Sequence, residues 1–226
     1  MLLFILADSH LELIPRRIWS HPSVVKWSRI RRKHPSKMIL DQTLFYPAIK
    51  KIGNLRNRGR VDILHRALLT ILDSSLSTNK LLLGVAVHTI NNDIYMVAPH
   101  TRLPRHYFRF LGLMEKLLES GVIRTPEGEP LIWREKNIRA CLENNNIEYV
   151  IGFSRRGSLV DLEEYLIVKT DEYSRIGLVF GAFPKGFFSP PVQEIIDDLI
   201  SIDSKPHTTS YTLCRVIITL EHILLK

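Results

Sequence analysis

Short apolar runs, each ending in a polar loop, alternate along this chain with stretches of helical periodicity. Runs of strand length begin near residues 2, 81, 93, 148, 176 and 199, and helical patterns cover about 62–73, 102–118, 134–144, 159–167 and 211–225. This alternation predicts an α/β domain with a mostly parallel sheet. Ligands of such sheets bind beyond the carboxyl ends of the strands, so the loops at those ends are the candidate sites.

Two local signals sharpen this outline. Asn91 and Asn92 tolerate the positive φ of a tight turn, so the runs at 81–90 and 93–98 are expected to form a hairpin. Asp62 stands where "VDILHRALLTILD" begins and is expected to cap that helix. The apolar start, "LLFILA", is too short for a signal peptide or a membrane span, because Asp8 and His10 follow it directly. It is therefore expected to be the first strand.

The charge balance favours a polyanionic partner. The 226 residues include 31 basic and 23 acidic side chains, which gives a net charge of +8 and a pI near 9.6. The densest run is "RIRRKHPSK", inside a basic stretch from Arg16 to Lys37, and it fits either a solvated face or a mobile loop. Cys141 and Cys214 lack the spacing of a disulfide framework or a zinc finger, so an intracellular chain without a metal site is expected.

The stretch "PHTRLPRHYFRFLGLMEKLL", residues 99–118, carries three arginines and an apolar stripe. If it is helical from about Arg102, then Arg102, Arg105 and Arg109 share one flank. The opposite flank would be core, and it comprises Tyr107, Phe110, Leu111, Met114, Leu117 and Leu118. Pro104 would fit the first turn and Thr101 would cap it. The residues alone leave open whether the arginines bind RNA or form a solvated, salt-bridged face.

Three polar loops follow strand runs in the last third of the chain: "FSRRG", "GAFPKG" and "IDSKPHTT". Glycines 181 and 186 bound the second loop and permit close backbone approach to a flat ligand. None of the loops matches a dinucleotide fingerprint or a phosphate-binding loop. By itself, a glycine-bounded loop such as "GAFPKG" is usually only a turn.

Taken together, "GRVDILHRALLTILDSSL", the arginine stretch and "LVFGAFPKG…ISIDSKP" resemble the Nep1/Emg1 family of ribosomal RNA pseudouridine N1-methyltransferases. The similarity runs in order over about 170 residues from Gly59, and less clearly through "ADSHLELIP". The C-terminal loops resemble the wider SPOUT methyltransferase group. The resemblance implies one SPOUT domain over residues 1–226, with an RNA-binding part to about 145 and a trefoil-knotted part from about 146. It also implies a homodimer that binds S-adenosyl-L-methionine in the knot.

The same resemblance assigns site residues. Arg102, Arg105 and Arg109 match RNA-binding arginines, whose forked guanidinium groups suit phosphate oxygens. The implied cofactor contacts are Phe153, Ser154, Gly181, Gly186, Phe187, Phe188, Ile202, Asp203, Ser204, Lys205, Pro206 and His207.

Three positions depart from the family pattern. Phe187-Phe188 replaces a more polar stretch, Lys205-Pro206-His207 replaces a common Tyr-Pro-Leu, and Val61 replaces the proline of an Arg-Pro-Asp motif. These departures affect side-chain assignments more than the cofactor assignment, because backbone groups make much of such binding.

The implied reaction transfers a methyl group to N1 of a pseudouridine, so a base must take the N1 proton. Asp62 and Asp73 are the carboxylates of the matching motif, and eleven helical residues separate them by roughly 16 Å. They cannot act as a pair. We assign Arg60 to the nucleotide, Asp62 to holding Arg60, and Asp73 to proton removal. The alternative for Asp73 is a helix-end residue, and His65 and His88 are interpreted as structural.

The expected partners are small-subunit ribosomal RNA, a second copy of the chain, and ribosomal proteins or assembly factors, with no DNA and no membrane. The expected location is the cytoplasm, or the nucleolus in a eukaryote. A second hypothesis is a pre-ribosomal RNA-binding assembly factor whose methylation is secondary. A related enzyme of another RNA specificity is a third.

Overall fold

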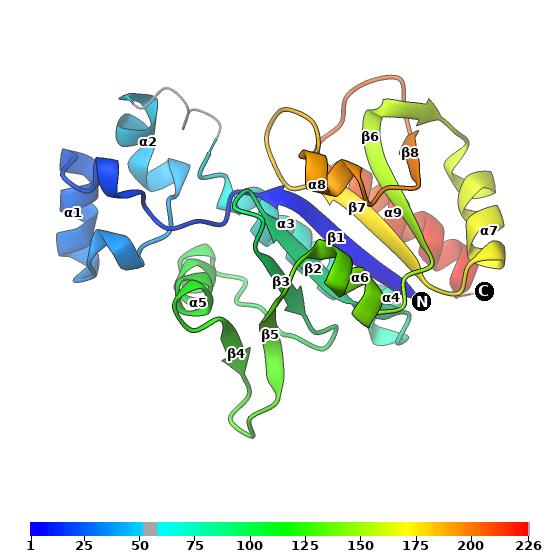
Figure 1. The fold of residues 1–226 in the computed structure, drawn as a ribbon, viewed down its shortest axis with the longest axis horizontal. Helices are drawn as coiled ribbons and strands as arrows, with labels where there is room; N and C mark the ends of the chain where they lie inside the picture. The colour runs from blue at the N-terminus through cyan, green and yellow to red at the C-terminus, as the bar shows by residue number, and fades with distance from the viewer. Residues whose placement is uncertain (52–57, 226) are drawn as a thin grey trace.

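The computed structural model describes residues 1–51 and 58–225 and contains one eight-stranded sheet (Figure 1). The strand order is β4-β5-β3-β2-β1-β7-β6-β8. The strands are β1 (Leu2–Ser9), β2 (Leu82–Thr89), β3 (Ile94–Val97), β4 (Val122–Arg124), β5 (Pro130–Glu135), β6 (Tyr149–Leu159), β7 (Ile176–Gly181) and β8 (Asp198–Ser201). The helices are η1 (Arg16–Ile18), α1 (Pro22–Arg31), η2 (Pro35–Lys37), α2 (Gln42–Lys51), α3 (Val61–Leu72), α4 (Ser75–Thr78), α5 (Tyr107–Ser120), α6 (Ile138–Asn144), α7 (Leu162–Glu172), α8 (Pro190–Gln193) and α9 (Thr209–Leu224).

The predicted mostly parallel sheet is confirmed. Parallel pairs join β1 to β2 and β7, and β6 to β7 and β8, whereas β2–β3, β3–β5 and β4–β5 are antiparallel. The expected hairpin is β2–β3, and Asn92 in its turn has φ 62°. The parallel part of the sheet therefore gathers the carboxyl ends of five strands, β1, β2, β6, β7 and β8, at one end of the sheet.

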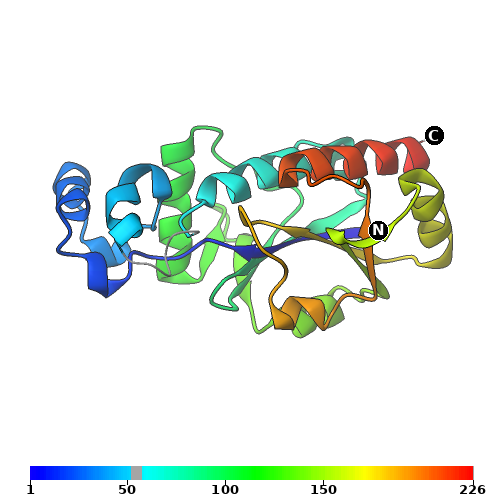
Figure 2. The ribbon, with the colours of Figure 1, turned by 90° about the horizontal axis from the view of Figure 1, so that it is seen from above.

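Strand β1 lies in the interior of the sheet, and both of its faces are buried. Leu2, Phe4 and Leu6 point into a core shared with α3 and α9. Leu3 and Ile5 alternate with them and point into a second core, shared with α6 and α8. Figure 2 shows the helices in these two layers, one on each side of the sheet. A strand buried on both sides needs a continuous apolar run, which explains "LLFILA".

The basic stretch between β1 and α3 is helical rather than a mobile loop. It forms η1, α1 and η2, and with α2 it encloses a third, separate core. That core consists of Ile14, Ile18, Val24, Met38, Leu40, Leu44, Phe45, Ala48 and Ile49. The charged residues of the stretch consequently lie on the outside of a small folded unit.

Two sequence-based boundaries are wrong. The helix expected over 134–144 begins at Ile138, because residues 130–135 pair with β3 and β4 as strand β5. The "FSRRG" loop is the second half of β6, which pairs with β8 beyond the bulge after Phe153. In both cases sheet pairing between distant segments overrides a local pattern. The short helix α8 was not predicted.

The chain has no obvious break at the expected division near residue 145, which falls in the turn between α6 and β6. Strands from both sides of that point share the sheet, since β1 pairs with β7. Within residues 1–51 and 58–225, no helix combines the length and hydropathy needed to cross a membrane.

Candidate functional site

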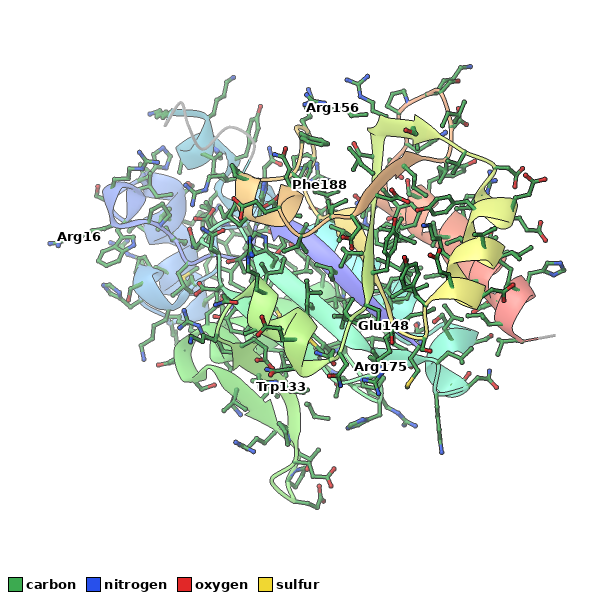
Figure 3. All side chains as sticks on the ribbon, turned by 45° about the vertical axis from the view of Figure 1, so that its right-hand side comes forward. Arg16, Trp133, Glu148, Arg156, Arg175 and Phe188 are labelled. Carbon is green, nitrogen blue, oxygen red and sulfur yellow. The ribbon has the colours of Figure 1, made fainter. Side chains whose placement is uncertain are left out.

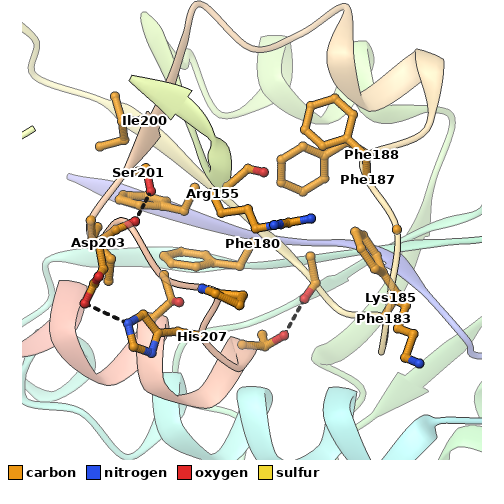
Figure 4. A pocket seen from close by; sticks show the side chains of 18 of the residues that line it. Arg155, Phe180, Phe183, Lys185, Phe187, Phe188, Ile200, Ser201, Asp203 and His207 are labelled. Carbon is orange, nitrogen blue, oxygen red and sulfur yellow. Dashed lines mark hydrogen bonds and ion pairs between the residues drawn. The ribbon is translucent and has the colours of Figure 1, made fainter. Parts of the chain in front are cut away.

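A pocket of about 510 Å³ opens at the carboxyl ends of β6, β7 and β8 (Figure 4). This volume is typical of small-molecule sites. It is lined by all the predicted cofactor contacts except Ser204: Phe153, Ser154, Gly181, Gly186, Phe187, Phe188, Ile202, Asp203, Lys205, Pro206 and His207. Residues outside the predicted contact set also line it: Arg155, Phe180, Phe183, Pro184, Lys185, Ile200, Ser201, Thr209 and Thr212. Parallel pairing explains the convergence, because it brings three loops distant in sequence to one edge.

Aromatic rings form much of the pocket wall. The Phe153 and Phe180 rings stack with their centroids 4.6 Å apart. Phe183 and Phe188 meet edge to face, and the Arg156 guanidinium lies 4.6 Å from the centroid of Phe187. Figure 4 shows Phe180 from β7, and Phe183, Phe187 and Phe188 from the loop that follows β7, around the pocket. Flat apolar walls of this kind suit a planar heteroaromatic ligand.

The loop after β8 is held by its own polar groups. The backbone N–H of Lys205 donates to Asp203 Oδ1 at 2.9 Å, and His207 Nε2 lies 2.9 Å from Asp203 Oδ2. These contacts lower the pKa of Asp203 to about 2, the Lys205 N–H contributing most. Thr209 Oγ1 also donates to the Gly181 carbonyl at 2.6 Å, which joins the start of α9 to the end of β7. The pocket thus has a preformed rim with a carboxylate that stays ionised.

The two glycines of the middle loop are needed for different reasons. A β-carbon on Gly181 would lie 2.8 Å from the ring of Phe183, so any larger residue would push that ring. Gly186 has φ +125°, a backbone conformation that side chains disfavour, although the space around it is open. Both positions therefore fix the shape of the pocket wall.

The polar residues at the carboxyl end of β1 lie at the same end of the sheet, and they were not among the predicted site residues. Asp8 adopts φ 54°, and its Oδ2 accepts the Ser189 N–H at 2.8 Å. Its own N–H donates to His88 Nδ1 at 3.2 Å, so His88 is structural. "ADSH" forms the carboxyl end of the central strand, and the rule that sites lie at such ends was signal enough to find it.

His10 belongs to this group. It is 6% exposed, and its Nδ1 is buried without a hydrogen-bond partner among the described residues. Burial, together with the charges of Arg58 and Arg60, lowers the pKa of His10 to about 4. His10 is thus a neutral imidazole with a free buried nitrogen next to the Arg60 charge.

Arg60 and Asp62 form a bidentate ion pair. Arg60 Nε and one terminal nitrogen lie 2.7 and 2.9 Å from the two oxygens of Asp62, and Arg66 adds a contact at 3.0 Å. Burial alone would raise the pKa of Asp62, but the Arg60 guanidinium outweighs it and holds that pKa below its usual value. The N-cap expectation is wrong. Arg60 is the cap residue, and Asp62 lies in the first turn, where its charge favours the helix dipole.

The three arginines of the RNA-binding prediction do not share one helix. Helix α5 begins at Tyr107, so it carries Arg109, whereas Arg102 and Arg105 precede it. Thr101 is buried and donates to the Leu131 carbonyl instead of capping. The Pro104 carbonyl bonds to His65 Nε2 at 2.8 Å, which makes His65 structural as predicted. These tertiary contacts, with the extended preference of a residue before proline, keep 101–106 out of the helix.

Other parts of that prediction hold. Phe110, Leu111, Met114 and Leu117 are buried core residues, while Tyr107 is half-buried and donates its hydroxyl to Asp41. The side chains of the three arginines remain exposed to solvent: Arg102, Arg105 and Arg109. Two of them lie in the loop before α5 and one in its first turn, and we call the three residues the arginine row.

Asp73 lies at the opposite end of the sheet from the pocket. It is the C-cap of α3, half exposed, and pairs with Arg105 at 3.0 Å. The hollow around it is also lined by Met1 and Leu82, at the amino ends of β1 and β2. Because α3 runs antiparallel to β1, it carries Asp62 to one end of the sheet and Asp73 to the other. Within one protomer the structure does not bring Asp73 to the pocket.

The comparisons with known proteins agree on one family. The sequence model of the EMG1/NEP1 methyltransferase family matches residues 4–221. The chain is 38% identical to the ribosomal RNA small subunit methyltransferase Nep1 of Staphylothermus marinus over 220 residues, which cover 97% of this chain and 94% of that protein. It is 38% identical to the Nep1 of Methanothrix thermoacetophila, over 100% and 98% of the two chains.

A solved structure gives the same result. The crystal structure of Archaeoglobus fulgidus Nep1 bound to S-adenosylhomocysteine superposes with a TM-score of 0.86 at 32% identity. The superposition covers 99% of each chain.

Among the described residues, no group of three or more His, Cys, Asp or Glu side chains has the arrangement to hold a metal ion. The chain belongs to the EMG1/NEP1 methyltransferase family.

Proposed function

We propose that this protein transfers a methyl group from S-adenosyl-L-methionine to small-subunit ribosomal RNA, at N1 of a pseudouridine. The observation that carries this is the pocket at the carboxyl ends of β6, β7 and β8, which is built from the loops that the family resemblance assigns to the cofactor. The relative from Archaeoglobus fulgidus was crystallised with S-adenosylhomocysteine, the product that methyl transfer would leave.

The residues present fit this cofactor. The aromatic walls offer flat apolar faces for an adenine ring, and Gly181 leaves the space that a side chain would fill. Asp203 presents a permanently charged carboxylate at the rim, which suits hydroxyl or ammonium groups. The cofactor itself would supply an electrophilic methyl group on a sulfonium. The protein's task is then to hold that group and a nucleobase in line, which can contribute much of the rate.

For the RNA, we propose contacts from Arg60, Arg102, Arg105 and Arg109, with Asp62 orienting Arg60. The Arg60–Asp62 pair fixes the guanidinium, so it can receive a nucleotide with little further loss of side-chain entropy. Arg60 lies at the pocket's end of the sheet and adjoins the unpartnered His10. These two residues mark where we expect the target nucleotide to enter.

We keep Asp73 as the proposed proton acceptor, with one condition set by the geometry. Because it lies at the amino end of the sheet, it can serve the pocket of a partner subunit but not its own. The proposal therefore requires the homodimer that the family resemblance implies. The trefoil knot and the cytoplasmic location also remain predictions.

Two measurements test the function. Titration calorimetry with S-adenosylhomocysteine tests the pocket, and single-turnover transfer of a labelled methyl group to a pseudouridine-containing RNA hairpin tests the reaction. A chain that binds the hairpin but neither binds S-adenosylhomocysteine nor transfers methyl would instead support an RNA-binding assembly factor.

A further inference from the structure

The whole net charge of the protein resides in one segment. Residues 13–40 contain no acidic side chain and eight basic ones: Arg16, Arg17, Lys26, Arg29, Arg31, Arg32, Lys33 and Lys37. Of the 31 basic residues, 23 remain elsewhere, and they are balanced by all 23 acidic residues. Outside this segment the chain is electroneutral, so a general excess of charge does not explain the pattern.

The segment does not need these charges to fold. Together with α2, it encloses its own apolar core, on which Trp19 and Trp27 also pack. Clustered like charges oppose compaction. Apolar contacts hold this unit together in spite of the repulsion between its cations. The clustering of cations therefore needs an explanation other than folding.

Part of the charge fixes the segment to α5. The Glu115 side chain is 1% exposed and receives both terminal nitrogens of Arg31, at 2.6 and 2.9 Å. It also receives Lys33 at 2.8 Å and the backbone N–H of Ile39 at 3.1 Å. A second, exposed pair joins Lys37 to Glu119 at 2.5 Å. A buried carboxylate with this many donors sets the position of the segment on α5.

The other cations face solvent. The side chains of Lys26, Arg29 and Arg32 are exposed, and among the described residues they have no ion pair or hydrogen bond. Figure 3 shows Arg16 at the outer edge of the same unit, far from Glu148 and Arg175. We call these four residues the α1 basic surface.

The anchor of the basic segment and one residue of the arginine row lie on the same helix, α5. Glu115, which anchors the segment, and Arg109, which belongs to the row, are on the same helix about 9 Å apart along its axis. That is about the rise of three base pairs at 3.4 Å each. A polynucleotide that contacts Arg109 therefore lies within a few nucleotides of the α5 position to which the basic segment is anchored.

We propose that the α1 basic surface is a second binding site for the RNA backbone, which holds rRNA flanking the target nucleotide. The inference rests on the proposed function, because that function supplies the RNA. Charges of one sign, free of partners and spread over a helix and its end, suit a row of phosphates and carry no sequence readout. The site would contribute affinity and orientation, whereas the cofactor pocket performs the reaction.

The test compares two triple variants that lose equal charge. One combines Lys26→Gln, Arg29→Gln and Arg32→Gln. The control combines Arg124→Gln, Lys136→Gln and Arg139→Gln, at exposed positions on β4, before α6 and on α6. Binding is measured by fluorescence anisotropy against salt, with a minimal target hairpin and with the same hairpin extended by a flanking duplex. Thermal melts verify that both variants fold.

For the extended RNA, we expect the α1 variant to bind roughly tenfold more weakly and its log–log salt slope to fall by about 2 to 3, or 0.7–0.9 per lost contact. Binding of the minimal hairpin, S-adenosylhomocysteine affinity and methyl transfer at saturating RNA should match wild type. The control variant should change the slope far less. These readouts separate this proposal from the proposed function, which fails only if wild type neither binds the cofactor nor transfers methyl.

Two results would overturn the proposal. One is an α1 variant whose affinity and salt slope for the extended RNA equal those of the control variant. The other is unchanged RNA binding together with lost binding of a polyglutamate peptide, which would assign the surface to an acidic protein.

Discussion

The two ends of the sheet differ in how they are built. At the carboxyl end, the pocket gathers part of β6 with the loops after β7 and β8, and the polar residues that end β1 adjoin them. At the amino end, a wider hollow of about 810 Å³ holds Asp73 with Arg102 and Arg105. The first is walled by stacked aromatic rings, whereas the second combines leucine side chains with the Arg105–Asp73 ion pair.

The difference shows that residues of one continuous sequence motif can lie at opposite ends of the sheet. The motif from Arg60 to Asp73 is continuous in sequence, but α3 spans the sheet and separates its ends by roughly 16 Å along the helix axis. Arg60 and Asp62 belong to the end with the pocket, and Asp73 to the other. If all three act in one reaction, two subunits must share the site.

The largest effect is expected from Gly181→Val at the carboxyl end. The new side chain would displace the Phe183 ring, which a β-carbon already approaches to 2.8 Å, and we expect no detectable S-adenosylhomocysteine binding by calorimetry. Gly112→Val is the control, because a β-carbon there meets nothing within 4 Å. A folded Gly181→Val protein with normal affinity would show that the cofactor binds elsewhere.

The next effect tests the amino end. If Asp73 removes the N1 proton, Asp73→Asn should slow single-turnover methyl transfer by about two to four orders of magnitude. RNA should bind slightly more tightly, since Arg105 loses its carboxylate partner. Asp93→Asn, another carboxylate paired with an arginine, is the control.

Mixing subunits sharpens this test. Asp73→Asn and Gly181→Val should each be inactive alone, yet their mixed dimers should recover activity if Asp73 serves the partner's pocket. The intact pocket then lies in the Asp73→Asn subunit, and its partner supplies the carboxylate. Mixed dimers without activity would contradict catalysis across the interface, and a near-normal rate for Asp73→Asn alone would leave positioning to explain the reaction.

A smaller effect concerns His10. Its pKa of about 4 in the folded chain lies below the usual 6.5, so the unfolded state binds the proton first as pH falls. This contribution to stability is present at neutral pH, is lost progressively below about pH 6.5, and amounts to about 2 kcal/mol lost by pH 5. Denaturant unfolding at pH 7 and pH 5 should show that His10→Asn loses correspondingly less than wild type. The exposed His100→Asn should behave as wild type, and an unchanged pH dependence in His10→Asn would contradict the argument.

The smallest effects are expected from single Ala substitutions in the arginine row. Each lost phosphate contact on single-stranded RNA should flatten the log–log salt slope by about 0.7. Arg105→Ala should weaken RNA binding least, because Arg105 must first leave Asp73. Cofactor affinity should not change in any of the three variants. Arg139→Ala provides the control. Unchanged RNA affinity in all three variants would show that the arginine row is a solvated surface that does not bind RNA.

Much of the fold and of the pocket was predictable from the sequence by itself. "LLFILA" was expected to be the first strand, and its continuous apolar run fits the burial of β1 on both faces. The rule that ligands bind beyond the carboxyl ends of parallel strands marked the loops near Phe153, Gly181 and Asp203 as candidates, and the family resemblance joined them into one cofactor site. A local sequence pattern is sufficient to place a residue where the regular geometry of a strand or a parallel sheet fixes which face or end that residue occupies.

Other features were decided only by tertiary structure. Helical periodicity put Arg102 and Arg105 on α5, but the contacts of Thr101 and Pro104 with distant segments hold them in a loop. Residues 130–135 became a strand because β3 and β4 offered partners. The sequence did not determine whether the basic run at 29–37 is ordered. In the structure the run is held by Glu115, 84 residues from Arg31 along the chain. In each case the deciding energy came from a partner distant along the chain, which no local pattern specifies.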